Sequence, residues 1–415
     1  MSKLQELIQR LCPDGVEYKK LGEVIKIYTG EQFNKRDMMS SGQYPVINGG
    51  ISASGYIDKY NEDQDTITIS QGGASAGYVS WQESPFWAGA HCYVIKPLSN
   101  ETSNRFIYFF LKNSESSLQQ MQHGAGIPAL NRDKVRNLWF PVLPLEVQEE
   151  IVRILDRFSD YAAELQAELQ AELQARKEQY EYYRNLLLTF NPAGCAGEAD
   201  DEQEGCVTTR GGHSYPIQWK KMGDVGTFIR GNGLQKKDFT ESGVGCIHYG
   251  QIYTYYGTFA TETKSFVSEE FAKKLRKAQT GDLVIATTSE NVEDVGKAVV
   301  WLGKDEIAIS GDAYVYKHNQ NPRYIAYLLQ TDRFLAFKRM NVSGTKVTRI
   351  SGDSLAKYPI PIPPLELQEK IVAILDRFET LVNDLSEGLP AEIAAVKEQY
   401  EYYRNRLLTF KEKTA

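Results

Sequence analysis

The run PLEVQEEIVRILDRF at 144–158 decides the fold, because it returns as PLELQEKIVAILDRF at 364–378. A second run, KEQYEYYRNLLLTF at 177–190, returns as KEQYEYYRNRLLTF at 397–410. Both matches hold at a constant offset of 220 residues and without gaps. An internal repeat of this length constrains the architecture before any single element is assigned. The chain therefore contains one long element twice.

A weaker match precedes each copy of the long element. YKKLGEV at 18–24 returns as WKKMGDV at 219–225, now at an offset of 201 residues, and the sequences between these matches diverge. The order is therefore a variable domain, a repeated helix, a second variable domain and a second repeated helix. Two different domains on one repeated element indicate two different targets. We expect the boundaries 1–143, 144–190, 191–217 (a linker), 218–363 and 364–415.

The repeated segments have the pattern of coiled-coil helices. Their apolar residues step by four and three, as in Ile151, Leu155 and Phe158. Pro144 and Pro364 stand where a helix start tolerates proline. A helix of about 45 residues would be roughly 70 Å long. We expect the two helices to pair antiparallel within the chain and to hold the variable domains apart; the alternative is that each helix packs separately on its own domain.

The middle of the repeated segments differs between the two copies. The first copy reads AELQ three times in succession at 163–174. The second copy reads EGLPAEIA at 387–394, where Gly388 and Pro390 predict a break or kink. The two helices are therefore expected to differ in continuity.

Each variable domain combines short β-rich runs with one apolar helical stretch, at 105–112 and 323–330. This mixture predicts an irregular sheet covered by helices. The fold class is thus α+β: two α/β domains and two long antiparallel coiled-coil helices, related by a pseudo-two-fold internal repeat. The expected strand runs are 44–50, 66–70, 76–81, 91–97, 246–253, 282–288, 297–302 and 307–317.

Charge is distributed unevenly along the chain. The net charge is −7, whereas a DNA-binding chain is usually basic. However, 218–363 has 20 Lys and Arg against 15 Asp and Glu, a net charge of +5. The corresponding net charges are −1 for 13–143 and −9 for 144–217. The acidity thus lies mostly in the first helix and the linker, and it leaves the second domain basic.

Targeting and cysteine patterns favour a cytoplasmic protein. No run of about 18 apolar residues is present, so no membrane partner is expected. The first residues lack the apolar core of a signal peptide. The five cysteines are irregularly spaced, which is not typical of a disulfide framework or of a zinc site.

Polar loops recur at equivalent places in the two variable domains. The loops 71–77 and 287–296 follow a strand, and the loops 124–134 and 343–353 precede a repeated helix. Their residue types are those that contact base edges and phosphates. Any single surface loop can be polar without binding DNA, but the paired occurrence favours DNA binding. The candidate DNA-binding residues are Lys35, Arg36, Gln71, Ser75, Asn131, Arg132, Lys134, Lys236, Lys237, Thr287, Ser289, Asn291, Lys346, Thr348 and Arg349.

The repeated helices also carry Tyr, Arg and Gln at matching positions. Tyr and Arg are common anchors of protein interfaces. Matching side chains on two copies of one helix predict that both copies bind the same kind of partner. The candidate partner-docking residues are Gln148, Arg157, Tyr182, Arg184, Gln368, Arg377, Tyr402 and Arg404.

Motifs of catalysis are missing from the sequence. There is no GxxxxGK[ST] phosphate loop, no HExxH, no GxSxG and no Gly-rich dinucleotide fingerprint. The five histidines do not cluster in the sequence. We therefore expect a recognition protein with no catalytic, cofactor or metal site of its own.

The repeated motifs PLE(V/L)QE(E/K)IV(R/A)ILDRF and KEQYEYYRN(L/R)LLTF, together with YKKLGE, resemble the conserved regions of type I restriction–modification specificity subunits. The resemblance covers the whole chain, in the order of two target recognition domains and two conserved helical regions. It implies a double-stranded DNA target in two parts, with one half read by each domain. The AELQ repeats resemble the spacers that set the gap between the two half-sites in some members.

The resemblance also implies partners. Two adenine-N6 methyltransferase subunits would bind the helices and carry S-adenosylmethionine. Restriction subunits with ATP- and Mg²⁺-dependent translocase activity can join such complexes. Two alternatives remain at this point: the specificity subunit of a related methyltransferase system that is not type I, and a non-catalytic coiled-coil scaffold with two protein-binding domains.

Overall fold

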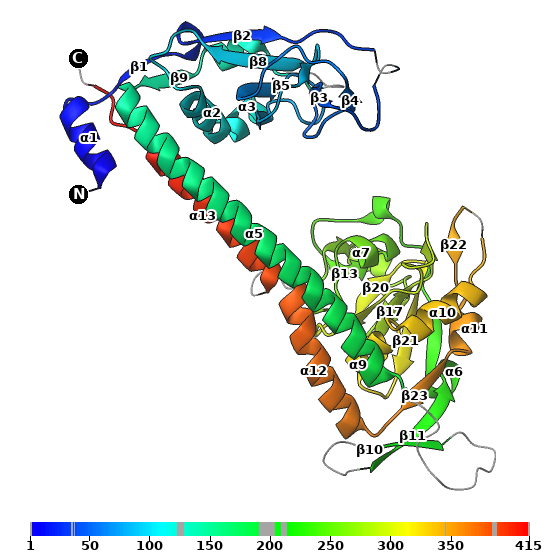
Figure 1. The fold of residues 1–415 in the computed structure, drawn as a ribbon. Coiled ribbons are helices and arrows are strands. Elements are labelled where there is room, and N and C mark those ends of the chain that lie inside the picture. Colours follow the sequence, from blue (N-terminus) through cyan, green and yellow to red (C-terminus); the bar gives the residue numbers. More distant parts are fainter. Residues whose placement is uncertain are drawn as a thin grey trace. The chain divides into compact units, whose positions relative to one another are not determined.

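The computed structural model describes residues 2–34, 36, 38–122, 128–190, 204–208, 214–344, 346–383 and 388–413, with only the backbone described for 204–208 and Ser214. The chain forms two compact units, Met1–Gln170 with Glu392–Ala415, and Ala171–Ala391. Each unit contains one variable domain and one part of each repeated segment (Figure 1). Among the described helices, none has the length and apolar composition required to span a bilayer.

The first variable domain is closed by its own two ends. Strand β1 (Glu17–Lys20) pairs antiparallel with β9 (Trp139–Val142), directly before the long helix. The main sheet is antiparallel in the order β2-β8-β5-β6, and a smaller sheet has the order β4-β3-β7. The remaining bounds are β2 (Ile25–Thr29), β3 (Tyr44–Ile47), β4 (Tyr56–Ile57), β5 (Thr66–Ser70), β6 (Val79–Gln82), β7 (Trp87–Ala88), β8 (Cys92–Pro97), α1 (Lys3–Leu11), α2 (Asn104–Asn113), α3 (Glu115–Gln120) and α4 (Arg132–Arg136).

The core of this domain lies between its main sheet and α2. Every residue of β5 is buried, as expected of a central strand packed on both faces. Ile67 and Ile69 of β5 join Phe106 of α2 and Phe140 of β9 in one hydrophobic cluster. The expected strands at 44–50, 66–70, 76–81 and 91–97 and the helix at 105–112 are confirmed.

The second variable domain repeats this plan with more strands. Its ends also meet, because β11 (Ser214–Lys221) pairs antiparallel with β23 (Pro359–Ile362). The sheets have the orders β12-β21-β17-β19-β14, β15-β13-β20-β16, β10-β11-β23 and β18-β22. The remaining strand bounds are β10 (Glu204–Thr208), β12 (Gly226–Arg230), β13 (Val244–Ile247), β14 (Phe259–Ala260), β15 (Ser265–Val267), β16 (Lys277–Ala278), β17 (Leu283–Ala286), β18 (Thr288–Ser289), β19 (Ala298–Trp301), β20 (Ile307–Ile309), β21 (Ala313–His318) and β22 (Thr348–Arg349).

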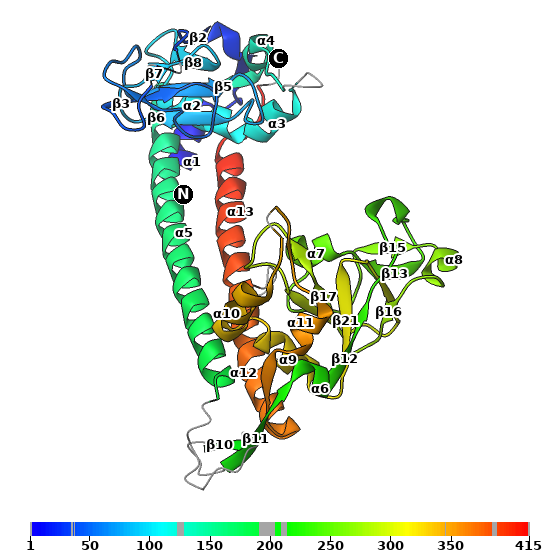
Figure 2. The same ribbon diagram turned by 90° about the vertical axis from the view of Figure 1, so that its right-hand side faces the viewer.

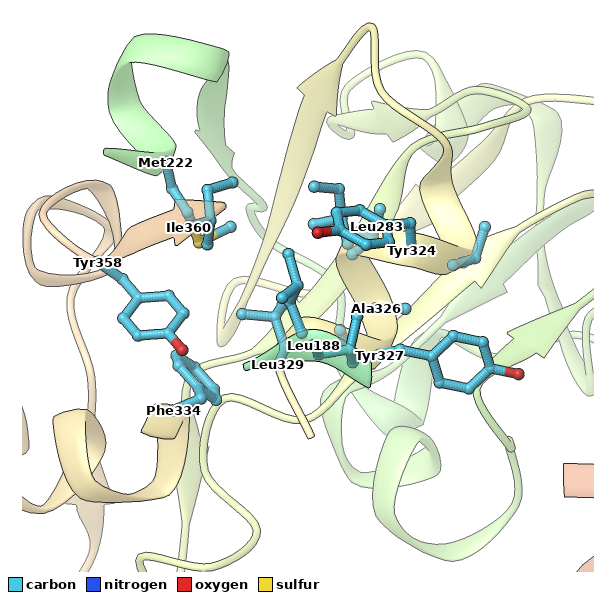
Figure 3. Close-up of a cluster of buried hydrophobic side chains, with 14 of the residues drawn as sticks. Leu188, Met222, Leu283, Tyr324, Ala326, Tyr327, Leu329, Phe334, Tyr358 and Ile360 are labelled. Carbon is cyan, nitrogen blue, oxygen red and sulfur yellow. The ribbon is translucent and has the colours of Figure 1, made fainter. Parts of the chain in front are cut away.

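Short helices cover the sheets of the second domain (Figure 2). Tyr324 and Tyr327 of the helix at 322–328 are fully buried against this sheet. The end of the first repeated helix lies in the same cluster, where Leu188 approaches Leu329 and Ala326 (Figure 3). The helix bounds are α6 (Met222–Val225), α7 (Tyr249–Thr254), α8 (Glu269–Ala272), α9 (Pro322–Leu328), α10 (Asp332–Asn341) and α11 (Gly352–Ala356).

The repeated helices pair antiparallel in both units. The first is α5 (Leu145–Leu188), and the second is divided into α12 (Leu365–Asn383) and α13 (Leu389–Leu407). In the first unit, Phe158 of α5 packs on Tyr403 of α13, with ring centroids 6.0 Å apart. In the second unit, Phe378 of α12 packs on Tyr183 of α5 at 5.6 Å. These two contacts are the same pair of repeat positions with the roles exchanged, so the expected antiparallel pairing is confirmed.

Three expectations need correction or completion. The run 249–253, expected as strand, is helix α7, because the His248 side chain accepts the backbone N–H of Gly250 and the Gln251 side chain accepts that of His248, which starts a helix. The expected linker 191–217 is partly sheet, since it contains β10 and the start of β11. The break expected at Gly388–Pro390 is present, with residues 384–387 outside the described part of the chain.

Candidate nucleic-acid interface

The two polar loops of the first domain lie against each other. Gly72 and Ala129 form an isolated β-bridge, and the Gly73 N–H donates to the Pro128 carbonyl at 2.8 Å. The Leu130 N–H donates to the Gln71 carbonyl, also at 2.8 Å. The backbone thus joins 71–77 to 128–134, which we call the first loop pair. Residues 123–127 lie outside the described ranges.

The second domain joins its two loops at the equivalent place. Strand β18 at the start of the loop 287–296 pairs antiparallel with β22, with Thr288 opposite Arg349. The Ile350 N–H donates to the Thr287 carbonyl at 3.1 Å, as Leu130 does to Gln71 in the first domain. We call 287–296 with 343–353 the second loop pair. The backbone connection is therefore the same in both domains although the loop sequences differ.

The predicted residues gather on these loop pairs. Gln71 and Ser75 lie on one side of the first pair, while Asn131, Arg132 and Lys134 lie exposed on the other. The Asn131 side chain accepts the Asp133 N–H at 2.8 Å and so caps α4, which presents the two cations to solvent. On the second pair the predicted residues are Thr287, Ser289, Asn291, Lys346, Thr348 and Arg349.

The residues of the second loop pair differ in what they have free. Thr287 is only 6% exposed and its hydroxyl donates to the Asp312 carbonyl at 3.0 Å, so its side chain serves the fold. Asn291 is exposed and exchanges hydrogen bonds with Asp294, which closes the turn of the loop. Lys346 and Arg349 are exposed cations. Base-reading chemistry therefore concentrates at Ser289 and Asn291, and phosphate-binding chemistry at Lys346 and Arg349.

The remaining predicted cations lie in the loops that follow β2 and β12. Lys236 and Lys237 are exposed in a single turn of 3-10 helix, Lys236–Asp238. Burial, with the charge of Lys236 as the next cause, lowers the pKa of His248. In the first domain Arg36 is exposed, whereas Lys35 lies outside the described residues. The sequence did not point to Arg230, an exposed cation whose guanidinium donates to the Gly311 carbonyl at 3.1 Å, next to Asp312.

The loop 287–296 borders a groove in the second unit. The groove has a volume of about 860 Å³ and is lined by Tyr253, Glu293, Lys297 and Lys338 of the domain and by Lys177 and Arg184 of α5. Opposite charges alternate around it, so it has no strong preference for one sign. In the described part of the chain, no three His, Cys, Asp or Glu side chains form a group that could hold a metal ion.

Two predicted docking residues, Gln148 and Gln368, are buried, at 1% and 0% exposure. The Gln148 amide accepts the Ser103 N–H at 2.8 Å and donates to the carbonyls of Leu143 and Glu101 at 2.7 and 3.1 Å. Gln368 likewise accepts the Asn321 N–H at 3.0 Å and donates to the Pro363 carbonyl at 2.8 Å. Each glutamine thus anchors a repeated helix to the domain that precedes it and leaves little surface for a partner.

The other predicted docking residues divide into two groups. Arg184 donates to Gln330 at 3.4 Å, and Arg404 donates to Asn113 at 3.3 Å, so each ties a helix end to a domain within its unit. The remaining residues are exposed, with Tyr182 and Tyr402 at 63% and 59%. The exposed members are Arg157, Tyr182, Arg377 and Tyr402.

An internally duplicated α+β frame that presents two loop pairs on antiparallel helices defines a two-site recognition protein. The family model for the type I restriction modification DNA specificity domain matches residues 13–175 and 216–395. The chain therefore belongs to the type I restriction–modification specificity family, as its repeated motifs predicted.

Individual relatives agree with this assignment over the whole length. A Haemophilus influenzae protein described as a type I restriction enzyme specificity subunit is 30% identical over 408 residues, covering 95% of this chain and 96% of the relative. The EcoR124I/EcoR124II specificity subunit of Escherichia coli is 26% identical over 426 residues, covering 99% and 98%. A solved structure from work on assembly and conformational transition of the type I R-M system has a TM-score of 0.63 and 17% identity, covering 96% of this chain and 98% of its own, so the fold is shared.

Proposed function

We propose that this chain reads a double-stranded DNA target in two halves, with the first loop pair on one half-site and the second loop pair on the other. The observation that carries the proposal is the backbone connection built twice around unlike side chains. A frame that is kept while its contents change suits a protein that must recognise two different sequences. Membership of a DNA specificity family supports the same conclusion.

Within each loop pair, we assign base reading and phosphate binding to different residues. Amide and hydroxyl side chains can pair with base edges in the major groove, which suits Gln71, Ser75, Ser289 and Asn291. Exposed cations position a protein on the phosphate backbone without reading sequence. That role falls to Arg132 and Lys134 in the first pair and, in the second pair, to Lys346 and Arg349, with Lys236 and Lys237 in a neighbouring loop.

The chemistry is assigned to partner subunits. Tyr182 and Arg157 of the first repeat match Tyr402 and Arg377 of the second at the offset of 220 residues, and all four are exposed. Identical exposed side chains suit two copies of one partner, which we propose are DNA adenine methyltransferase subunits. These would bring S-adenosylmethionine, and restriction subunits that join them would bring ATP- and Mg²⁺-dependent activity. The complex is expected to work in the cytoplasm.

Modification-detecting sequencing of DNA from cells that express this chain with its methyltransferase partner tests the proposal. A Ser289→Ala, Asn291→Ala double variant should relax the base preference of one half-site, by about tenfold or more. A Gln71→Ala, Asn131→Ala double variant should relax only the other half-site. A target that stays intact in both variants, or that changes in both halves at once, would contradict the assignment of one loop pair to each half-site.

A further inference from the structure

Both loop pairs are held from behind by a side chain that donates to a backbone carbonyl. In the first domain, the Gln122 amide donates to the Ala76 carbonyl at 2.5 Å. In the second domain, the Lys338 ammonium donates to the Glu293 carbonyl at 2.7 Å. Gln122 follows helix α3 and Lys338 lies on α10, so both donors come from the helical layer that follows the main sheet. The two donors are 216 residues apart, close to the repeat offset, which makes them equivalent.

The Lys338 bond uses a buried charge. Lys338 is 4% exposed, and burial lowers its pKa to about 8, while the charges of Asp294 and Glu293 raise it and that of Arg339 lowers it. Holding a cation in such a place costs free energy unless its hydrogen bonds are made. A buried apolar residue would avoid this cost, so the position has a use for the donor.

The loop is shaped to lie on this lysine. Gly296 has φ +80, and a Cβ there would meet the Lys338 Cδ and the Phe334 ring at 3.2 Å. A glycine at this point therefore lets the loop backbone approach the lysine stem. The start of the loop is fixed separately, because the Tyr253 hydroxyl donates to the Thr288 carbonyl at 2.9 Å. Ser289 and Asn291 lie between these two fixed points.

We propose that Lys338 and Gln122 are positioning residues for target recognition, each fixing one loop of a loop pair and thereby the base preference at one half-site. Neither side chain is placed on DNA; each acts through the carbonyl that it holds. The inference rests on the proposed function, since it assumes that the loop pairs read DNA. It adds that specificity depends on a donor behind each loop, in the helical layer of the domain.

Lys338→Met and Gln122→Met test the inference in the complete complex with the methyltransferase partner. Methionine keeps an unbranched side chain of similar length and removes the donor. Lys338→Met should lower discrimination by about tenfold at the half-site read by the second loop pair, the scale of one lost charge-assisted hydrogen bond, and leave the other half-site unchanged. Gln122→Met should do the reverse, with a smaller loss because its bond is neutral.

The half-site-resolved readout separates positioning from general stability. A variant that only destabilised the chain would reduce the amount of active complex and lower modification at both half-sites in the same proportion, with the base preferences intact. That result for both variants would overturn the inference. Thermal melting of each variant reports whether it folds. If Lys338→Met does not fold, Gln122→Met carries the same test in a neutral, partly exposed setting.

A direct loop variant distinguishes failure of this inference from failure of the proposed function. If Asn291→Ala changes the second half-site and Lys338→Met does not, the loop reads DNA and Lys338 does not position it. If Asn291→Ala changes nothing either, the loop is not a reading element and the proposed function is wrong at this site.

Discussion

The two variable domains share a backbone plan and differ in the side chains placed on it. Each joins its loop pair by the same backbone connection, to Leu130 in the first domain and to Ile350 in the second. The donor behind the loop is a neutral amide in the first domain and a buried lysine in the second. The second domain also has the higher net charge, +5 against −1. The difference teaches that the frame depends on backbone bonds, which leaves the side chains free to change with the target.

The largest effect is expected where the two domains are most alike, at the helix anchors. Gln148→Leu and Gln368→Leu each leave at least two buried backbone groups without a partner, so each should lower the unfolding free energy of its unit by about 3 kcal/mol. Calorimetry of each variant measures the effect, with separate transitions for the two units where they unfold independently.

Gln170→Leu is a matched control for these anchors. Gln170 is exposed on α5, so the same change there should alter stability by less than about 0.5 kcal/mol. A loss in only one of the two anchor variants would break the equivalence of the two repeats that the hydrogen bonds at Gln148 and Gln368 indicate.

The second prediction concerns the point where the domains differ. Lys338 has a pKa of about 8 in the folded chain, against 10.5 for an ordinary lysine. Between these pH values the unfolded chain holds a proton that the folded chain has lost, so raising the pH through this window stabilises the folded state. From pH 8 to 10, the natural chain should gain on the order of 1–2 kcal/mol relative to Lys338→Met.

Urea unfolding of the two proteins at both pH values measures this difference. Groups other than Lys338 titrate in both proteins, and their contributions cancel in the comparison. Gln122→Met is the control from the first domain, since an amide does not titrate and its difference from the natural chain should stay constant. A Lys338 difference that is equally constant would show that this lysine keeps an ordinary pKa.

The sequence alone predicted the parts of this architecture that repeat. The offset of 220 residues identified both helices, and the spacing of Ile151, Leu155 and Phe158 predicted their pairing. It predicted the break near Pro390 because proline and glycine act locally. It missed helix α7, because the capping bonds of His248 and Gln251 are invisible in a pattern of apolar residues.

The candidate site was predictable in kind and only partly in position. Polar composition pointed to the two loops of each domain, and the fold brings those loops together. Composition could not show that Thr287, Gln148 and Gln368 are buried, since their burial depends on contacts with distant segments. For the same reason Lys338 was not singled out: its role arises from a carbonyl 45 residues away in the sequence.

The smallest effect is expected from single cations at the loop pairs, and it tests the charge difference between the domains. Lys346→Ala and Arg349→Ala should each weaken DNA binding by less than about tenfold and lower the salt slope by about one, with base preference kept. Arg132→Ala and Lys134→Ala should act in the same way in the first domain. Lys304→Ala is the matched control, because this exposed lysine lies in the turn between β19 and β20, outside the loop pair.

Gel shifts of the complex with its methyltransferase partner, over a range of salt concentrations, measure these slopes. Because the second domain carries the surplus of cations, removing several of its cations together should reduce the slope further than removing those of the first. Equal slopes after matched removals would mean that the extra positive charge of the second domain lies away from DNA. A slope identical to that of the natural chain in all four single variants would mean that the loop-pair cations do not contact phosphate, although the loops themselves could still read bases.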